Sequence, residues 1–149
     1  MNKFRLIVNN CGLQQSLMVV FVFLGANSLS GFTSDTEMLL SENACQYCDL
    51  DNIDLSNTNL KGVQLTAASL INSNLSRSNM REASLMNSEL MGALLKHTNL
   101  SSADLTNAYL CSANLTNANL SNANLSRAVF VDAILDQANL QDIVIDKQG

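Results

Sequence analysis

Few residues of this 149-residue chain could carry chemistry: the pair Cys45 and Cys48, another cysteine at Cys111, and the single histidine His97. Two cysteines separated by two residues can form a disulfide, act as a redox pair, or supply two of the four ligands of a structural zinc site. No acid, base or nucleophile forms an obvious set with His97, and the sequence contains no glycine-rich phosphate loop. We therefore expect no enzymatic activity, no cofactor and no bound metal.

The composition is biased in a way that indicates a repeat. Charged residues make up 14% of the chain, which contains no proline and no tryptophan. An average globular chain has about 25% charged residues. The net charge is −5 and no run of basic residues occurs, so we expect no binding to nucleic acid, which requires clustered Lys and Arg.

Residues 1–28 have the pattern of a secretory signal peptide. Lys3 and Arg5 precede an apolar run over residues 17–26, and the small residues Ala26-Asn27-Ser28 follow. A membrane span needs about 20 apolar residues, so we expect no stable membrane span. The prediction is export to the periplasm, the thylakoid lumen or the external medium, with Cys11 removed along with the signal. A buried N-terminal helix or an uncleaved anchor is the alternative.

From Cys48 onward the sequence repeats every five residues. Each fifth position from Leu50 to residue 145 is Leu, except Met80, Phe130 and Ile145, which are also apolar. A small residue lies two positions before most of these central residues. Alanine fills this place at positions 68, 83, 93, 103, 108, 113, 118, 123, 128, 133 and 138.

A period of five fits neither an α-helix nor a single strand, whose periods are about 3.6 and 2. The pattern works if the backbone turns after every five residues, so that the central residue and the small residue point inward. Four such sides close a square coil of twenty residues, and residues 48–147 make about five coils. Asparagines at positions 59, 79, 99, 119 and 139 then form one column, which predicts a ladder of stacked amides.

The tandem motif, as in Ala113-Asn114-Leu115-Thr116-Asn117, resembles the pentapeptide-repeat family. The resemblance covers residues 48–147 and implies an all-β solenoid, the right-handed quadrilateral β-helix of that family. The sequence departs from the family pattern where Leu94, Tyr109, Val129, Ile134 or Val144 replaces the usual polar residue before the central position.

Residues 29–47 are predicted to cap the first coil. Ser34 and Glu37 have the spacing of a capping box, which predicts a short helix. Cys45 and Cys48 fall in the two inward registers at adjacent positions, so in an oxidising compartment we expect a disulfide. Free buried thiols, or a metal or redox pair, are the alternatives. The sequence around this pair resembles exported bacterial pentapeptide-repeat proteins, and Cys111 is expected to be an outward, odd thiol.

Apolar residues at outward positions predict an interface toward the C-terminal end, because clustered exposed apolar side chains usually mark a binding surface. We hypothesise that the C-terminal coil docks on a partner, most simply as a homodimer. A loose fit of the repeat at its degenerate end is the alternative. The candidate interface residues are Ile71, Met91, Tyr109, Val129, Val131, Ile134 and Val144.

Two function classes follow. The first is a non-enzymatic structural or protein-interaction module exported from the cytoplasm, whose partner the sequence does not name. The second, implied by the family resemblance, is a DNA mimic that binds a type II topoisomerase such as gyrase. Mimicry needs rows of carboxylates, whereas the outward acids of this chain scatter over all four faces and alternate with basic residues. The first class is therefore favoured.

Overall fold

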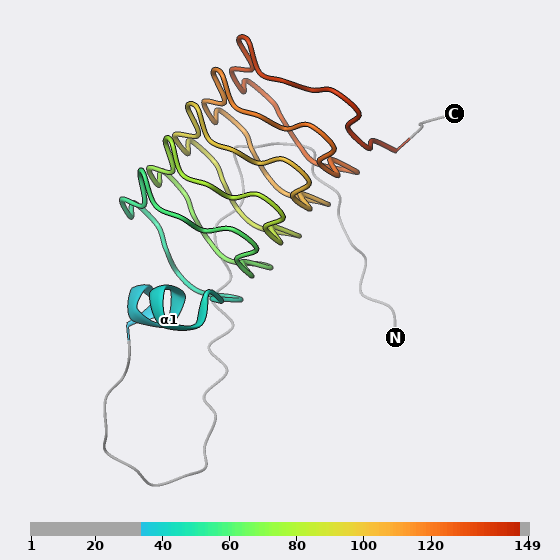
Figure 1. Cartoon of the computed structure of the whole chain (residues 1–149). Coiled ribbons are helices and arrows are strands. Elements are labelled where there is room, and N and C mark those ends of the chain that lie inside the picture. Colours follow the sequence, from blue (N-terminus) through green and yellow to red (C-terminus); the bar gives the residue numbers. More distant parts are fainter. Residues whose placement is uncertain (1–33, 147–149) are drawn as a thin grey trace, which may run out of the picture. The chain divides into compact units, whose positions relative to one another are not determined.

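The computed structural model describes residues 34–146. The predicted signal peptide at residues 1–28 lies outside these described residues, as do residues 29–33 of the predicted cap and Lys147. The described part begins with one helix and continues as a stack of coils that follow one another in sequence order (Figure 1).

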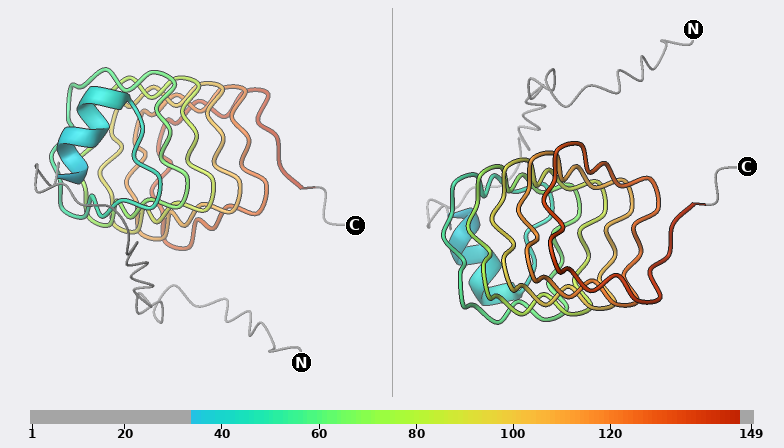
Figure 2. Two further views of the ribbon diagram at one scale, coloured as in Figure 1. Left: turned by 90° about the horizontal axis from the view of Figure 1, so that it is seen from below. Right: turned by 90° about the horizontal axis from the view of Figure 1, so that it is seen from above.

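Helix α1 spans Asp35–Glu42 and begins with the capping box that the sequence predicts. The Ser34 hydroxyl accepts the backbone N–H of Glu37, and the Glu37 carboxylate accepts the backbone N–H of Ser34, both at 3.2 Å. The helix ends at Asn43, which has a left-handed φ of 52°. Leu39 of α1 is 1% exposed and belongs to the apolar core, so the helix packs against the coils (Figure 2).

The coils are held in register by parallel backbone bridges between residues twenty positions apart. Each five-residue unit contributes one isolated bridge rather than a long strand, and four columns of bridges define four sides. We name them by their bridging residues. Side A includes the column from Asp49 to Val129, side B from Asp54 to Ile134, side C from Asn59 to Asn139, and side D from Ala44 to Val144.

Backbone hydrogen bonds explain why the period must be twenty. The N–H of Leu50 donates to the carbonyl of Ser69 at 2.8 Å, and the N–H of Asn74 donates to the carbonyl of Ile53 at 2.8 Å. Equivalent bonds recur along the stack, so each coil satisfies the polar backbone of its neighbours. Within a coil, each corner is a turn in which, for example, Ala83 N–H donates to the carbonyl of Met80 at 3.1 Å.

The residue before each central Leu is usually Asn or Asp because its side chain closes the next turn. The Asn74 side-chain oxygen accepts the N–H of Ser76 at 3.2 Å, and the same bond joins Asn114 to Thr116 at 3.1 Å. Such short polar side chains bind the backbone two residues on. At Asp54, hydrogen bonds from the Ser56 side chain and backbone lower the pKa of the carboxyl group.

The amide ladder predicted on side C is confirmed at three of its four steps, all but the step from Asn79 to Asn99. Hydrogen bonds join Asn79 to Asn59 at 3.0 Å, Asn119 to Asn99 at 3.4 Å, and Asn139 to Asn119 at 3.1 Å. These bonds run along the stack and reinforce the backbone pairing on that side.

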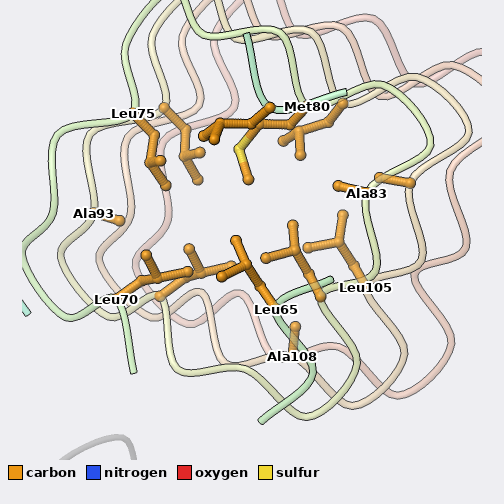
Figure 3. Packing of buried hydrophobic residues seen from close by; sticks show 14 of the residues in the cluster. Leu65, Leu70, Leu75, Met80, Ala83, Ala93, Leu105 and Ala108 are labelled. Atoms are coloured by element: carbon orange, nitrogen blue, oxygen red, sulfur yellow. The ribbon is translucent and has the colours of Figure 1, made fainter. Parts of the chain in front are cut away.

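The interior is filled by the central residues of all four sides. Leu65, Leu70, Leu75 and Met80 point inward (Figure 3) and are fully buried. Full burial of such a side chain contributes about 1.5–3 kcal/mol, so the repeated Leu is the main source of stability. Within residues 34–146, four buried Ser or Thr residues occupy small-residue positions, and the Ser73 hydroxyl finds no hydrogen-bond partner there.

The turns also require positive φ at their third residue, as a type II turn does. Asn fills many of these sites, and glycine fills two of them: Gly62 with φ +68° and Gly92 with φ +67°. A side chain at Gly62 would meet open space, whereas a Cβ at Gly92 would clash with the side-chain oxygen of Asn72.

We predict that Gly92→Ala lowers the free energy of unfolding more than Gly62→Ala does. Both variants place a Cβ at positive φ, which costs about 1 kcal/mol. Only Gly92→Ala also has to displace the exposed Asn72 side chain, so the additional loss should be small. Urea unfolding of the two variants measures the difference. Replacing Asn72 by Gly in the Gly92→Ala background should remove it, and equal losses in the two single variants would show that the clash has no energetic effect.

Candidate interaction surfaces

The C-terminal end of the solenoid exposes residues that are core elsewhere. The central residue Leu120 is fully buried and Leu125 is 7% exposed, but Leu140 is 40% and Ile145 is 59% exposed. Phe130 and Leu135 are only partly buried. The cause is that the described residues provide no further coil to cover the last one.

These side chains line a hollow of about 380 Å³ at that end. Its apolar lining is Leu125, Ala128, Phe130, Leu135, Leu140, Ile143 and Ile145. Arg127 and Asp146 also line it, and they form an ion pair with 3.0 Å between Arg127 Nε and Asp146 Oδ2. The hollow is therefore an apolar surface with a charged pair among its lining residues.

The same end also has an unpaired backbone edge. The N–H groups of Leu115 and Leu120 donate to the carbonyls of Ile134 and Asn139, one coil further on. Among residues 34–146, no backbone carbonyl accepts from the corresponding N–H groups of Leu135 and Leu140. An edge of this kind can pair with another chain.

The seven predicted interface residues do not form one patch. Ile71, Met91, Tyr109, Val129 and Val131 do share side A, because residues twenty positions apart stack. Their neighbours at the N-terminal end of the same side are Asp49 and Asp51, so side A changes from acidic to apolar along the stack.

The other two residues lie elsewhere. Ile134 is on side B, in the column that contains Leu94, and Val144 is on side D. They are 43% and 54% exposed, and Val131 on side A is 51% exposed. Val131, Ile134 and Val144 therefore lie near the C-terminal end of the solenoid but on three different sides.

Cys45 and Cys48 are joined by a disulfide, with 1.99 Å between the sulfur atoms, and both side chains are buried. The Asp35 side chain lies close enough to both sulfur atoms that the three residues could together hold a metal ion. In the disulfide, however, the sulfur atoms are not thiolates, which are the form that binds metal. Asp35 instead accepts the backbone N–H of Asp49 at 2.8 Å and thereby ties α1 to the first coil.

Cys111 differs from the expectation of an outward thiol. Its side chain is only 3% exposed, and it is not a free thiol. His97 does lie at an exposed corner, as its register predicts. Neither residue forms part of the three-residue metal-binding geometry at Cys45 and Cys48.

The acidic residues do not form a long row on any side. Asp49 and Glu89 stand in one column of side A, separated by Ser69, and that column continues with Tyr109 and Val129. Burial, and then the negative charge of Asp51, raise the pKa of Glu89. Asp51 itself accepts hydrogen bonds from the Ser69 hydroxyl and the Ile71 N–H.

Within residues 34–146, no helix combines the length and apolarity needed to cross a lipid bilayer. The helix that the structure describes, α1, has eight residues. A membrane-spanning helix needs about 20.

Both a protein-family model and solved structures of other proteins match this chain. The family model for pentapeptide repeats matches residues 48–87, 88–126 and 103–142. A pentapeptide repeat protein of the Arabidopsis thaliana thylakoid lumen aligns with TM-score 0.66 and 24% identity, over 78% of this chain and 77% of that protein. No curated protein sequence matches the chain significantly.

Two further solved structures align less closely. The pentapeptide repeat protein Rfr23 from the cyanobacterium Cyanothece 51142 is 30% identical, with TM-score 0.48, over 76% of this chain and 94% of that one. QnrB1, a plasmid-mediated fluoroquinolone resistance protein, is 16% identical, with TM-score 0.46, over 70% of this chain and 82% of that one. The match to the family model implies the right-handed quadrilateral β-helix that the sequence predicts.

We predict that Glu89→Gln increases the free energy of unfolding at pH 7. The pKa of Glu89 is higher in the folded protein than in the unfolded chain. The protonated carboxyl group therefore stabilises the fold at low pH, and this stabilisation is lost as the pH rises through the folded-state pKa. Glutamine has no charge to bury, so the variant avoids this loss at pH 7. The gain should stay below about 1 kcal/mol, because the carboxyl group is partly exposed and water screens it. Urea unfolding at about pH 7 and about pH 4 tests this.

The control is Glu82→Gln. Glu82 is exposed and pairs with Arg81 at 3.1 Å and with Lys61 at 4.0 Å, so its removal should give no gain. The explanation fails if Glu89→Gln stabilises equally at both pH values, or if Glu82→Gln gives the same gain.

Proposed function

Because this chain belongs to the pentapeptide-repeat family, we propose that it is a non-enzymatic protein-interaction module that acts outside the cytoplasm and docks through its C-terminal coil. The observation that carries this proposal is the uncovered apolar end of the solenoid. Leu140 and Ile145 occupy core positions of the repeat and are nevertheless 40% and 59% exposed.

Binding, rather than catalysis, suits the way the solenoid is built. The central Leu residues from Leu65 to Leu120 are fully buried, so over these coils side chains fill the interior. A catalytic site needs a concave pocket with convergent polar groups. The hollow at the C-terminal end is lined mainly by aliphatic side chains, which suits docking of another apolar surface.

A second copy of the chain is the partner that we propose for this end. Two copies that meet end to end would cover each other's hollow and bring two unpaired backbone edges together. A two-fold arrangement of this kind closes on itself, because each copy uses the same surface. At the opposite end, α1 lies over the core with Leu39 buried, so growth into a filament is disfavoured.

Export is supported by the cysteine chemistry and by the sequence of residues 1–28. A buried disulfide such as Cys45–Cys48 persists in oxidising compartments and is rare in the cytosol. The periplasm, the thylakoid lumen and the external medium all meet this condition.

Expression of the full-length gene with a C-terminal tag in a bacterium tests export. We expect recovery from the periplasm, with a mature N-terminus between residues 29 and 31 from cleavage near Ser28. Sequencing the N-terminus of the purified protein measures this. Recovery from the cytoplasm with an intact N-terminus would contradict export and would favour the alternative of a DNA mimic acting on gyrase.

Light scattering tests the dimer. We expect the mature protein to have a dimer's mass at tens of micromolar and Ile145→Asp to have a monomer's mass, because a buried carboxylate at the contact is costly. Ile145 is 59% exposed within one copy, so the variant should keep its fold, which circular dichroism checks. The matched control is Leu40→Asp on α1, where Leu40 is 62% exposed. A monomeric mature protein, or equal loss in both variants, would rule out this interface.

A further inference from the structure

The basic residues of the solenoid divide into two groups. Lys61 and Arg81 pair with Glu82, at 4.0 and 3.1 Å, and Arg127 pairs with Asp146 at 3.0 Å. The remaining lysine and arginine of residues 34–146, Lys96 and Arg77, form no ion pair in that part of the chain.

These two residues lie together although they are nineteen positions apart in the sequence. The backbone N–H of Arg77 donates to the carbonyl of Lys96 at 2.9 Å, so they are in hydrogen-bonded neighbouring coils. Neighbouring coils lie about 4.8 Å apart. His97 follows Lys96 directly and occupies the same turn position as Arg77, twenty positions earlier. We call Arg77, Lys96 and His97 the basic corner.

The backbone exposes all three side chains of the basic corner. Arg77 and His97 occupy the turn position with positive φ, at 60° and 58°, and all three residues are exposed. Each lies on the corner that follows side B, so the three exposed side chains start from one small area of the surface.

An apolar side chain lies beside these charges. Leu94 occupies the outward position of side B that is Asn in the adjacent coils, at Asn74 and Asn114, and it is 43% exposed. The Ser76 hydroxyl donates to the Leu94 carbonyl at 3.5 Å, which places the coil of Arg77 next to Leu94. The basic corner therefore combines positive charge with one exposed apolar contact.

The surroundings contain no carboxylate in the neighbouring coils of the same columns. Residues that stack in line with Lys96 are Ser76 and Thr116, and those in line with Arg77 and His97 are Asn57 and Asn117. Asp136 is also in line with Lys96 but lies two coils away. Asp54 lies in the column of Leu94, one coil from Arg77, and its carboxylate accepts the N–H of Ser56 at 2.9 Å. Within residues 34–146, no ion pair neutralises Arg77 or Lys96, on a protein with net charge −5.

We propose that the basic corner binds an acidic, extended segment of a partner protein. Carboxylates of the segment pair with Arg77 and Lys96, His97 donates a hydrogen bond, and an apolar side chain of the segment packs on Leu94. Arginine favours this role because its planar guanidinium matches a carboxylate with two hydrogen bonds. Two cations neutralise too few phosphates for nucleic-acid binding, which makes a protein partner the better fit.

Fluorescence anisotropy of a labelled acidic peptide tests this. The probe is a dodecapeptide with six Glu residues around one Leu, titrated with mature protein in low salt. We expect the double variant Arg77→Gln/Lys96→Gln to weaken binding at least about fivefold. The control Lys61→Gln/Arg81→Gln removes the same charge from a neighbouring side and should change binding less than about twofold. High salt should weaken the binding of the unmodified protein.

The proposal would be overturned if the peptide did not bind at millimolar protein, or if both double variants lost peptide affinity equally. It would also be overturned if a twelve-nucleotide single strand bound more tightly than the peptide and this binding depended on Arg77 and Lys96. Leu94→Asn should weaken the peptide further and leave the fold intact, because Asn is the residue of the adjacent coils. Ile145→Asp, which tests the C-terminal contact, should leave peptide binding unchanged, so the two surfaces are tested independently.

Discussion

The hydrogen bonding of each coil to the next is the constraint on which the rest of this structure depends. The N–H of a central residue reaches the carbonyl nineteen positions later, as Leu50 does with Ser69 and Leu100 does with Asn119. One inserted residue would shift every later bond and would move inward side chains outward. Because the length of the coil cannot vary, each position keeps one environment along the whole stack. The composition of the chain follows from this: Leu where space is wide, Ala where it is narrow, and Asn where a turn must close.

The repeat alone was enough to predict the buried positions and the amide ladder of side C, because both depend only on periods of five and twenty. Ser34 and Glu37 likewise predicted the start of α1, since a capping box is a local signal. The hydrogen bond that the N–H of Asp49 donates to the Asp35 carboxylate does not follow from the sequence, because it depends on how the helix packs rather than on spacing.

The surface was harder to predict from the sequence. The sequence groups Val144 and Ile134 with the residues of side A because all are apolar residues at outward positions of the repeat. The bridges instead assign them to sides D and B. The sequence predicts that Cys111 is an outward thiol, yet its side chain is buried. The position of a residue in the repeat predicts the direction of its side chain, but it does not predict how much of that side chain is exposed. Arg77 and Lys96 are neighbours because residues nineteen positions apart lie in adjacent coils. The sequence shows this only when the twenty-residue coil is applied to outward as well as inward positions.

The two ends of the solenoid are unlike, and this difference bears on function. At the N-terminal end, Leu39 of α1 fills the core and the disulfide Cys45–Cys48 lies beneath the helix. Such a cap is what a repeat protein needs to protect its first coil from water. The last described coil has no equivalent, and its central residues become steadily more exposed from Leu125 to Ile145. Apolar surface exposed in this way is stabilised when another surface covers it.

Along the filled coils, packing constrains the inward positions, so between the two ends the outward positions are the ones free to vary. Outward departures from the repeat are therefore the informative residues of such a chain. Leu94 stands where the coils on either side have an Asn that closes a turn, at Asn74 and Asn114. It precedes Lys96 by two residues, and Arg77 lies in the adjacent coil. The exposed Leu94 therefore lies beside two cations that form no ion pair within residues 34–146. Departures from local rules are expected at functional sites, and this one supplies the apolar contact that the proposed acidic segment needs.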